Sequence, residues 1–212
     1  MAQTVAIIDY GSGNLRSVAK AFERAASEAE IAASINVTDD PDIIAGADRI
    51  ALPGVGAFGA CIDGLKARDG VIEALEHAAL AEARPFLGIC VGMQLLAETG
   101  HEFGIHDGLG WIPGKVVAID AAGVEVPHMG WNTINGHAHR KIPKLLEGKS
   151  FYFAHSFHFE PENDAHIYGV TSYGQDVVAA VGRDNILGLQ FHPEKSQSAG
   201  INVIAGFLKW TP

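Results

Sequence analysis

The chain has 212 residues, of which 48% are hydrophobic and 19% are charged, a composition typical of a globular protein with one sizeable core. Its formal net charge of −10 argues against nucleic-acid binding, because a phosphate backbone has to be met by Lys and Arg. No apolar stretch is long enough to span a membrane, and two cysteines without a secretory signal favour free thiols in a reducing cytoplasm.

The first half alternates strand-like and helix-like segments. Compact apolar or β-branched runs predict strands, and apolar residues at helical spacing predict helices. In chain order, the predicted strands are 5–9, 31–37, 49–52 and 86–89, and the predicted helices are 15–29, 61–81 and 91–98. This alternation favours βαβ units and a parallel sheet that is covered on both faces.

The second half predicts shorter strands separated by Gly, Asn and Asp turns, a pattern typical of hairpins. These strands are 115–120, 124–126, 150–160, 167–173, 177–181 and 186–190, and a last helix is predicted at 199–209. We therefore expect a single α/β domain over residues 1–212, with an open, mostly parallel sheet, helices on both faces and antiparallel additions in the second half.

The segment Gly88-Ile89-Cys90-Val91-Gly92 joins an apolar strand to a helix through a tight turn. This pattern is typical of a nucleophile elbow, which exposes a reactive side chain at the edge of a sheet. The helix N-terminus beside Cys90 favours its thiolate form, and the Val91 N–H can face a developing oxyanion. Taken alone, the segment fits a buried structural cysteine equally well.

The segment Gln190-Phe191-His192-Pro193-Glu194 follows an apolar strand. A thiol nucleophile needs a base that takes its proton and returns it to the leaving group, and His192 can serve as that base. Glu194 can hold the imidazole in one tautomer and stabilise its cation. Taken alone, a surface turn with a solvated His and Glu would be the better interpretation, but the Cys elbow reverses that preference.

A glycine-rich segment, residues 52–59, follows the third predicted strand. In a doubly wound sheet, loops at the carboxyl ends of strands line the ligand crevice. The glycines allow N–H groups of this backbone to face a substrate oxygen, which would supply the second half of an oxyanion hole. A plain glycine-rich turn is an equally good interpretation of the loop alone.

Two further patterns do not support a cofactor or a metal. The Gly11-Ser12-Gly13-Asn14 loop resembles the start of a dinucleotide fingerprint, but Arg16 stands where the third glycine belongs. The His137/His139 and His155/His158 pairs lack the helical spacing of a zinc site, and no Cys pair completes one. We therefore expect no cofactor and no metal, and we interpret Cys61 as a helix-core residue.

Together these segments resemble the class I glutamine amidotransferases, which use a Cys-His-Glu triad. Within that class, they most closely resemble the glutaminase subunits of imidazole glycerol phosphate synthase, an enzyme of histidine biosynthesis. The Cys and His-Pro-Glu motifs mark the superfamily only, whereas the joint occurrence of the others is specific. The resemblance extends over nearly the whole chain, through Ile8-Asp9-Tyr10-Gly11-Ser12-Gly13-Asn14-Leu15, Leu52-Pro53-Gly54-Val55-Gly56-Ala57-Phe58, Gly88-Ile89-Cys90-Val91-Gly92-Met93-Gln94, Pro127-His128-Met129-Gly130-Trp131-Asn132, Phe153-Ala154-His155-Ser156 and Phe191-His192-Pro193-Glu194-Lys195-Ser196.

The resemblance implies that Cys90 attacks the side-chain amide of glutamine, forms a glutamyl thioester and releases ammonia, while His192 acts as the base and Glu194 orients it. It implies oxyanion donors at the N–H groups of Val91 and Val55, and reorientation of the Val55 peptide for activity. The residues implied to hold glutamine are Gln94, Ser156, Glu102, Gly54 and Gly56. The residues implied to face a partner are Asn14, Trp131, Tyr152 and Lys195.

The implied partner is a (βα)₈-barrel cyclase that forms a heterodimer with this chain. It would receive ammonia through its interior and make imidazole glycerol phosphate and AICAR in the cytoplasm. Because Val55 stands in the loop rather than another glycine, we expect the loop to rest with a carbonyl facing the substrate. The free chain would then hydrolyse glutamine slowly until ligand binding in the partner flips the peptide. Val91 stands where relatives often have leucine, which matters little for a backbone donor.

Three other functions compete with this interpretation. The chain could be a glutaminase subunit for anthranilate or pyridoxal phosphate synthesis, but the Val55-Gly56-Ala57-Phe58 loop argues against those subunits. A stand-alone cysteine hydrolase, such as a peptidase or a γ-glutamyl hydrolase, would be active without a partner. A regulatory subunit without activity is disfavoured because all three members of the triad are present.

Overall fold

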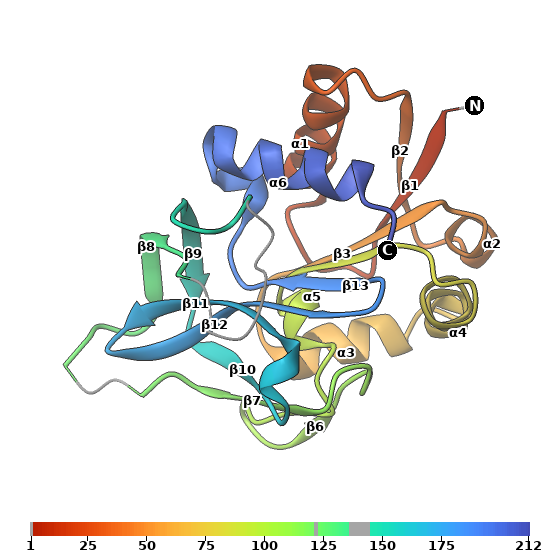
Figure 1. Cartoon of the computed structure of the whole chain (residues 1–212). Coiled ribbons are helices and arrows are strands. Elements are labelled where there is room, and N and C mark those ends of the chain that lie inside the picture. The colour runs from red at the N-terminus through yellow and green to blue at the C-terminus, as the bar shows by residue number, and fades with distance from the viewer. Residues whose placement is uncertain (1, 121–122, 136–144) are drawn as a thin grey trace.

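The computed structural model describes residues 2–120, 123–135 and 145–212 of the chain (Figure 1). The described strands are β1 (Gln3–Ile8), β2 (Ala33–Thr38), β3 (Arg49–Gly54), β4 (Phe86–Cys90), β5 (Thr99–Gly100), β6 (His106–Asp107), β7 (Gly114–Ala118), β8 (His128–Thr133), β9 (Ser150–His155), β10 (Phe157–Pro161), β11 (Ile167–Tyr173), β12 (Gln175–Arg183) and β13 (Ile186–Leu189). The described helices are α1 (Leu15–Glu28), α2 (Pro41–Ala45), α3 (Phe58–Lys66), α4 (Val71–Glu76), α5 (Val91–Gln94) and α6 (Gln197–Lys209), with single-turn segments η1 (His77–Ala81), η2 (Asp164–His166) and η3 (Pro193–Lys195).

The described strands form one large sheet and two smaller ones. The large sheet has the order β11-β12-β13-β4-β3-β1-β2, and its strands from β13 to β2 run parallel. Strands β12 and β11 add to it in the antiparallel direction. Helices α1 and α6 lie together on one face, and α3 and α4 lie on the other (Figure 1). The expected α/β fold, with a mostly parallel sheet and antiparallel additions, is confirmed.

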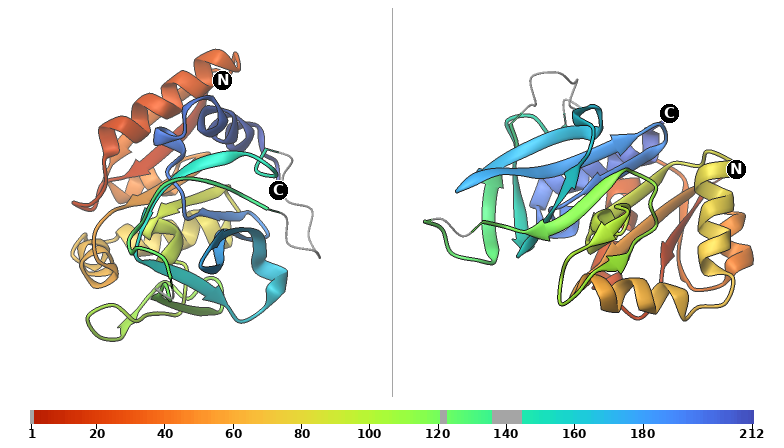
Figure 2. Two further views of the ribbon diagram at one scale, coloured as in Figure 1. Left: turned by 90° about the vertical axis from the view of Figure 1, so that its left-hand side faces the viewer. Right: turned by 90° about the horizontal axis from the view of Figure 1, so that it is seen from below.

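The second half also builds structure outside the large sheet. Strands β10, β7, β5 and β6 form a four-stranded sheet, and β8 pairs with β9 in a two-stranded one. In the right-hand view of Figure 2, the β8–β9 pair lies on the side of the molecule opposite α3 and α4. These two small sheets were not predicted, because β5 and β6 have only two residues each and β8 contains Gly130 and Asn132, which are depleted in strands.

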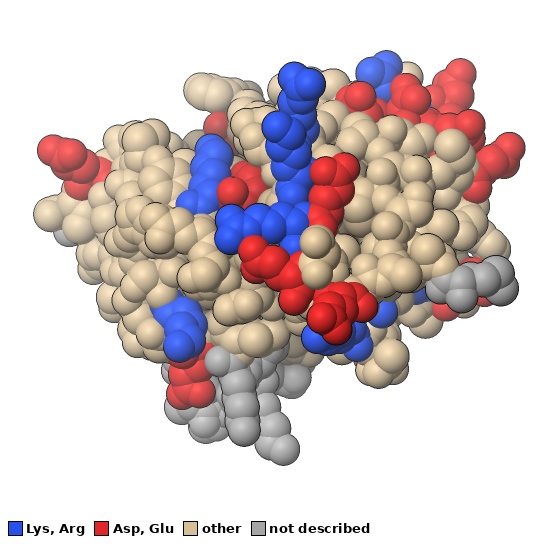
Figure 3. All heavy atoms as spheres, turned by 90° about the horizontal axis from the view of Figure 1, so that it is seen from above, with Lys and Arg blue, Asp and Glu red and all other residues tan. Residues whose placement is uncertain are grey.

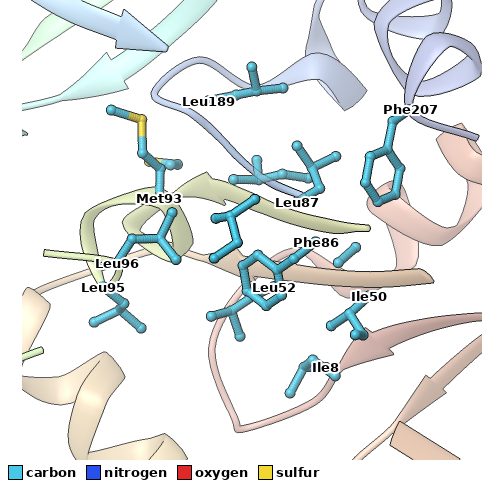
Figure 4. Close-up of a cluster of buried hydrophobic side chains, with 14 of the residues drawn as sticks. Ile8, Ile50, Leu52, Phe86, Leu87, Met93, Leu95, Leu96, Leu189 and Phe207 are labelled. Carbon is cyan, nitrogen blue, oxygen red and sulfur yellow. The ribbon is translucent and has the colours of Figure 1, made fainter. Parts of the chain in front are cut away.

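The hydrophobic core lies under the central parallel strands. Figure 4 shows Ile50, Leu52 and Phe86 from β3 and β4 in one cluster with Leu189 from β13 and Phe207 from α6. All five side chains are buried, and each contributes roughly 1.5–3 kcal/mol through removal of apolar surface from water. Strands β3 and β4 are therefore anchored in the hydrophobic core.

Four predicted elements differ from the structure, and three of them are divided or irregular. The helix predicted at 61–81 is divided into α3, α4 and the π-helical turn η1, because Gly70 takes the left-handed φ of 77° before α4. The strand predicted at 124–126 is an irregular segment, and the strand predicted at 150–160 is divided at Ser156 into β9 and β10.

The helix predicted at 91–98 ends at Gln94. The carbonyl groups of Leu95, Leu96 and Ala97 accept hydrogen bonds from the N–H groups of residues 109, 112 and 110, in that order, instead of continuing the helix. These bonds join α5 to a segment that follows it in the chain, so a tertiary contact overrides the helical propensity of the sequence.

The surface agrees with the acidic composition of the chain. On the face seen in Figure 3, Lys and Arg side chains gather near the middle, with Asp and Glu side chains beside them. Among the residues that the structure describes, no helix is both long and apolar enough to cross a membrane.

Candidate active site

Cys90 and His192 meet because their strands are neighbours. Strand β13 pairs in parallel with β4, with Leu189 opposite Ile89, so both strands end at the same edge of the sheet. Cys90 is the last residue of β4, and His192 lies three residues after the end of β13. Both side chains line a cavity of about 350 Å³ at this edge, together with Val55, Gly56, Val91, Gln94, Glu102, Pro127, Met129, Ala154, His155, Ser156, Phe157 and Lys195.

The turn at Cys90 has the geometry expected of a nucleophile elbow. Cys90 has φ 55° and ψ −113°, a strained conformation for a residue with a side chain, at a cost of about 1–3 kcal/mol. A methyl group on Gly92 would clash with the carbonyl oxygen of Leu52, and one on Gly88 would clash with the carbonyl oxygen of Gly92. The two glycines are therefore required because the backbones of β3, β4 and α5 approach one another closely.

His192 is held between Glu194 and Cys90. Its Nδ1 lies 2.8 Å from Glu194 Oε1, and both side chains are buried. Because a carboxylate can only accept, Nδ1 carries the proton and Nε2 is left for Cys90. Burial lowers the pKa of His192, but hydrogen bonds to Cys90 and Glu194 and their negative charges outweigh burial and raise it well above its ordinary value. The site therefore favours the protonated form of the His192 imidazole.

Two buried glutamines connect Cys90 to the strand on the other side of the cavity. Gln94 Nε2 donates to the carbonyl of Phe157 at 3.0 Å and to Gln190 Oε1 at 3.1 Å. Gln190 Nε2 lies 3.8 Å from Cys90 Sγ, within hydrogen-bonding reach of sulfur. Gln94 thus borders the cavity with its amide nitrogen already engaged, and Ser156 lies next to the Phe157 carbonyl that engages it.

The Pro53–Gly56 loop enters the cavity from β3. Gly54 is buried and is not among the cavity-lining residues, and a methyl group there would lie 2.5 Å from Tyr10 Oη. Val55 and Gly56 line the cavity, and Val55 is 43% exposed. The Val55 N–H donates to Ser12 Oγ at 3.1 Å, and the same hydroxyl donates to the Val55 carbonyl at 2.6 Å. The Val55 N–H is therefore bound to Ser12.

Tyr10 and Cys61 support the same loop from beneath. The Tyr10 hydroxyl donates to the Pro53 carbonyl at 2.8 Å, and Cys61 Sγ lies 3.4 Å from the Val55 carbonyl. Burial, followed by the neighbouring Cys61, raises the pKa of Tyr10 and keeps its hydroxyl protonated as a donor. Cys61 is a buried residue of α3, as expected, and it also contacts Ser12 Oγ at 3.4 Å.

Glu102 reaches the cavity from the loop between β5 and β6. Its Oε2 accepts a hydrogen bond of 2.8 Å from the Phe58 N–H at the start of α3. This bond orients the carboxylate at the rim, where it can attract a cationic group of a ligand. The structure thus brings Glu102 to the same cavity as Cys90, Gln94 and Ser156.

Three of the four residues predicted to face a partner lie together. Trp131 on β8 is paired with Tyr152 on β9 and packs against its ring at 6.2 Å, and Lys195 Nζ lies 5.8 Å from the centre of that ring. Lys195 also borders the cavity. Asn14 lies apart, before α1, where its side chain accepts the Ser17 N–H and caps the helix.

Sequence reasoning missed several residues that contact the predicted site. Gln190, Ser12 and Tyr10 were seen only as parts of motifs, and His155 was considered only within a motif and as a metal ligand. A polar Gln190 at the end of an apolar strand was a usable signal, because a buried amide needs hydrogen-bond partners. The contacts of Ser12 and Tyr10 join residues more than 40 positions apart in the chain and left no local signal.

Comparisons with known proteins agree with this geometry. The family model for glutamine amidotransferase class-I matches residues 6–209. An imidazole glycerol phosphate synthase subunit HisH of Rhodospirillum rubrum is 54% identical over 212 residues, covering 98% of this chain and 99% of the relative. The subunits HisH of Brucella abortus (strain 2308) and Zymomonas mobilis are 54% and 52% identical, covering 98% and 100% of this chain and 99% and 98% of those relatives.

Solved structures share the fold at low sequence identity. A crystal structure of a glutamine amidotransferase superposes with a TM-score of 0.68 at 16% identity, covering 97% of this chain and 99% of that chain. A glutamine amidotransferase of Thermotoga maritima superposes with a TM-score of 0.61 at 18% identity, covering 92% of this chain and 77% of that chain. Both similarities support the fold alone.

Proposed function

The chain belongs to the class I glutamine amidotransferases, and within them to the family of HisH subunits of imidazole glycerol phosphate synthase, and from this premise we propose that it hydrolyses glutamine through a Cys90-His192-Glu194 triad. The observation that carries the proposal is the buried His192–Glu194 pair, at 2.8 Å, behind the cavity that Cys90 lines. A solvated surface turn would not hold both side chains out of water.

Acylation begins when Cys90 Sγ attacks the side-chain amide carbon of glutamine. His192 Nε2 takes the thiol proton and gives it to the amide nitrogen, so that the carbon–nitrogen bond breaks and ammonia leaves. The product on the enzyme is a γ-glutamyl thioester. Water then attacks the thioester carbon, His192 takes a proton from that water, and Cys90 leaves as the thiol while glutamate is released.

Glu194 keeps this base in the productive state. By accepting the Nδ1 proton, its carboxylate leaves Nε2 facing Cys90 and stabilises the imidazolium that forms. In this proposal Gln94 and Ser156 hold the glutamine and the Glu102 carboxylate receives its ammonium group, which is supported by the position of all three residues on the cavity wall. Gly54 and Gly56 let the loop backbone approach the substrate on the opposite side.

Two N–H groups serve as oxyanion donors in this proposal, those of Val91 and Val55. The Val55 N–H is bound to Ser12 in the resting loop, so it must turn toward the cavity before it can donate to an oxyanion. Because a trans peptide places its two polar groups on opposite sides, the Gly54 carbonyl points away from Ser12. A missing oxyanion donor costs about 10²–10³ in rate, so the free chain is expected to be slow.

The partner is the cyclase subunit of imidazole glycerol phosphate synthase, a (βα)₈ barrel. It docks over the cavity mouth through the cluster of Trp131, Tyr152 and Lys195, with Asn14 as a further contact. Ammonia passes into its interior and is used in histidine biosynthesis, in the cytoplasm, to make imidazole glycerol phosphate and AICAR. Ligand binding in the partner turns the Val55 peptide and raises the glutaminase rate.

Hydroxylamine trapping tests the chemistry of the proposal. Hydroxylamine captures a γ-glutamyl thioester as γ-glutamyl hydroxamate, which we expect from the wild-type chain incubated with glutamine. Cys61→Ser, which changes the other cysteine, should still form the hydroxamate, whereas Cys90→Ala should not. Hydroxamate formation by Cys90→Ala would refute Cys90 as the nucleophile.

A further inference from the structure

Two buried histidines that the proposed mechanism does not use face each other across the β8–β9 pair. His128 and His155 are directly opposite in the register, and only 2% and 6% of their surfaces are exposed. His128 is stacked between the rings of Phe153 and Tyr173, at 4.7 and 4.0 Å between centroids. His128 Nδ1 lies 3.0 Å from His155 Nε2, so exactly one of these two nitrogens must carry a proton for a hydrogen bond to form.

Asn132 fixes the direction of this bond from one end. Its amide oxygen accepts the Thr133 N–H at 2.8 Å, and its amide nitrogen donates to the Ser172 carbonyl at 2.9 Å, so the orientation of the amide is determined by two backbone groups. The same nitrogen lies 3.3 Å from His128 Nε2. Since an amide nitrogen only donates, His128 Nε2 accepts, and the proton of His128 lies on Nδ1.

The Phe157 carbonyl fixes the same direction from the other end. His155 Nδ1 lies 2.8 Å from that carbonyl oxygen, which can only accept, so His155 carries its proton on Nδ1 and accepts from His128 at Nε2. Every ring nitrogen is then satisfied with both imidazoles neutral, and an additional proton would place two donors face to face. Burial lowers the pKa of His128 to about 4 and that of His155 to about 3, which agrees with two neutral rings.

The chain of hydrogen bonds ends on the cavity wall. The Phe157 carbonyl accepts from His155 and also from Gln94 Nε2, and Gln94 leads through Gln190 to Cys90 Sγ. Ser156, between His155 and Phe157, lines the cavity where β9 ends and β10 begins. The position of this turn, and with it the Gln94 amide, therefore depends on two bonds donated by imidazoles.

We propose that His128 and His155 are positioning residues for glutamine binding, which hold the Ser156–Phe157 turn and the Gln94 amide in place through the directional series Asn132, His128, His155 and the Phe157 carbonyl. This inference rests on the proposed glutaminase function. Neither histidine touches the reacting atoms, and neither exchanges a proton during turnover.

A matched pair of substitutions at His128 separates the hydrogen bond from the packing. His128→Phe keeps an aromatic ring between Phe153 and Tyr173 but leaves His155 Nε2 without a donor. His128→Asn loses the ring but places an amide nitrogen where Nδ1 was, so it can still donate to His155. A purely packing role predicts that His128→Phe is the milder change, and the positioning role predicts the reverse.

Glutamine binding is read from protection of Cys90 against alkylation by iodoacetamide. For His128→Phe, we expect the glutamine concentration that gives half-protection to rise about tenfold, the effect of leaving one buried acceptor unsatisfied. The alkylation rate without glutamine should change less than about twofold, because the elbow itself is intact. His128→Asn should restore most of the affinity. Equal half-protection concentrations in His128→Phe and the wild type would overturn the proposal.

The tautomers of the wild-type chain provide a test that needs neither turnover nor a variant. Nitrogen-15 NMR of the imidazoles should find His128 and His155 protonated at Nδ1 and unprotonated at Nε2 throughout pH 5–8. A proton on Nε2 of either ring, or a charged ring in that range, would overturn the proposal.

The alkylation experiment separates failure of this proposal from failure of the proposed function. If glutamine fails to protect Cys90 in the wild type, the proposed function fails and this proposal fails with it. Protection that is unchanged in His128→Phe refutes the positioning role alone.

Discussion

The turn at Cys90 and the Pro53–Gly56 loop border the same cavity, but they are held in place by different forces. The turn at Cys90 is buried, and Gly88 and Gly92 contact backbone atoms so closely that neither can carry a side chain. The loop is partly exposed at Val55, and a methyl group on Gly56 would meet nothing within 4 Å. Packing therefore fixes the nucleophile, whereas hydrogen bonds from Ser12 and Tyr10 hold the loop.

This difference suits the two to different tasks. Close-packed interiors change shape only at a high cost in free energy, so the direction of the Cys90 side chain is constant. A hydrogen bond contributes only about 0.5–1.5 kcal/mol net, so a docked partner can supply enough energy to turn the Val55 peptide. The proposed mechanism thus combines a rigid nucleophile, Cys90, with an oxyanion donor at Val55 that a partner can switch.

The largest expected effect comes from a methyl group at Gly92. In Gly92→Ala the new atom would clash with the Leu52 carbonyl, which should destabilise the chain by about 3 kcal/mol or more and remove measurable glutaminase activity. Gly56→Ala is the matched control in the loop, where only the left-handed φ of 97° opposes the change, at about 1–2 kcal/mol. Urea unfolding measures the stability of both variants. A lower free energy of unfolding for Gly56→Ala than for Gly92→Ala would contradict the difference between the packed turn and the loop.

The next largest effect is expected from Glu194→Gln. An amide can no longer stabilise the imidazolium or enforce the Nδ1–H tautomer, so the glutaminase rate with the loaded partner should fall by roughly 10³–10⁴. Turnover measured with saturating glutamine checks this expectation. A loss of less than tenfold would mean that the buried His192–Glu194 contact is structural.

Smaller changes are expected when the loop is released. In Ser12→Ala, the Val55 N–H and carbonyl lose their side-chain partner, so glutamine hydrolysis by the free chain should rise by up to about tenfold. Ser12→Thr keeps the hydroxyl and should stay near the wild-type rate. Val55→Gly should also raise the basal rate, because glycine removes the barrier to turning the peptide. Unchanged basal rates in both Ser12→Ala and Val55→Gly would contradict a loop held by these contacts.

The smallest effect is a pH dependence of stability. Because the folded state raises the pKa of His192, its protonation stabilises the fold fully below the unfolded pKa of about 6.5, and this contribution is lost as the pH rises through the folded pKa. Glu194→Gln weakens this stabilisation by the protonated imidazole. The free energy of unfolding of the variant should therefore fall furthest below that of the wild type under about pH 6.5, and the difference should shrink at alkaline pH. Denaturant titrations at several pH values measure it, and a difference that grew with pH would have the wrong sign.

The sequence was sufficient for the parts of the molecule that are determined locally. The apolar runs at β1, β3 and β4 and the Gly88–Gly92 turn carry their structure in a few consecutive residues, and they locate Cys90 at the sheet edge. His192 and Glu194 were predicted from chemistry, because a thiol nucleophile needs a base and a group that orients that base. The parallel pairing of β4 with β13, which brings them to the edge where Cys90 lies, was seen only in the structure.

The parts that could not be predicted depend on contacts between distant segments. The helix after Cys90 stops early because its carbonyl groups bond to residues 109–112. The bond between Ser12 and Val55 joins residues 43 positions apart, and the His128–His155 bond requires the β8–β9 register. No local periodicity reports such pairings, so the resting state of the loop and the buried imidazole pair appear only in three dimensions.

Glutamate production from glutamine tests the central claim most directly. It would be measured for the purified chain alone, with the cyclase subunit, and with the cyclase plus its nucleotide ligand, using Cys90→Ala as the blank. The account predicts slow hydrolysis by the chain alone and a rise of about 10²–10³ with the loaded partner, as the second oxyanion donor turns into place. Full activity of the chain alone, unaffected by the loaded cyclase, would contradict both the resting loop and the proposed partner.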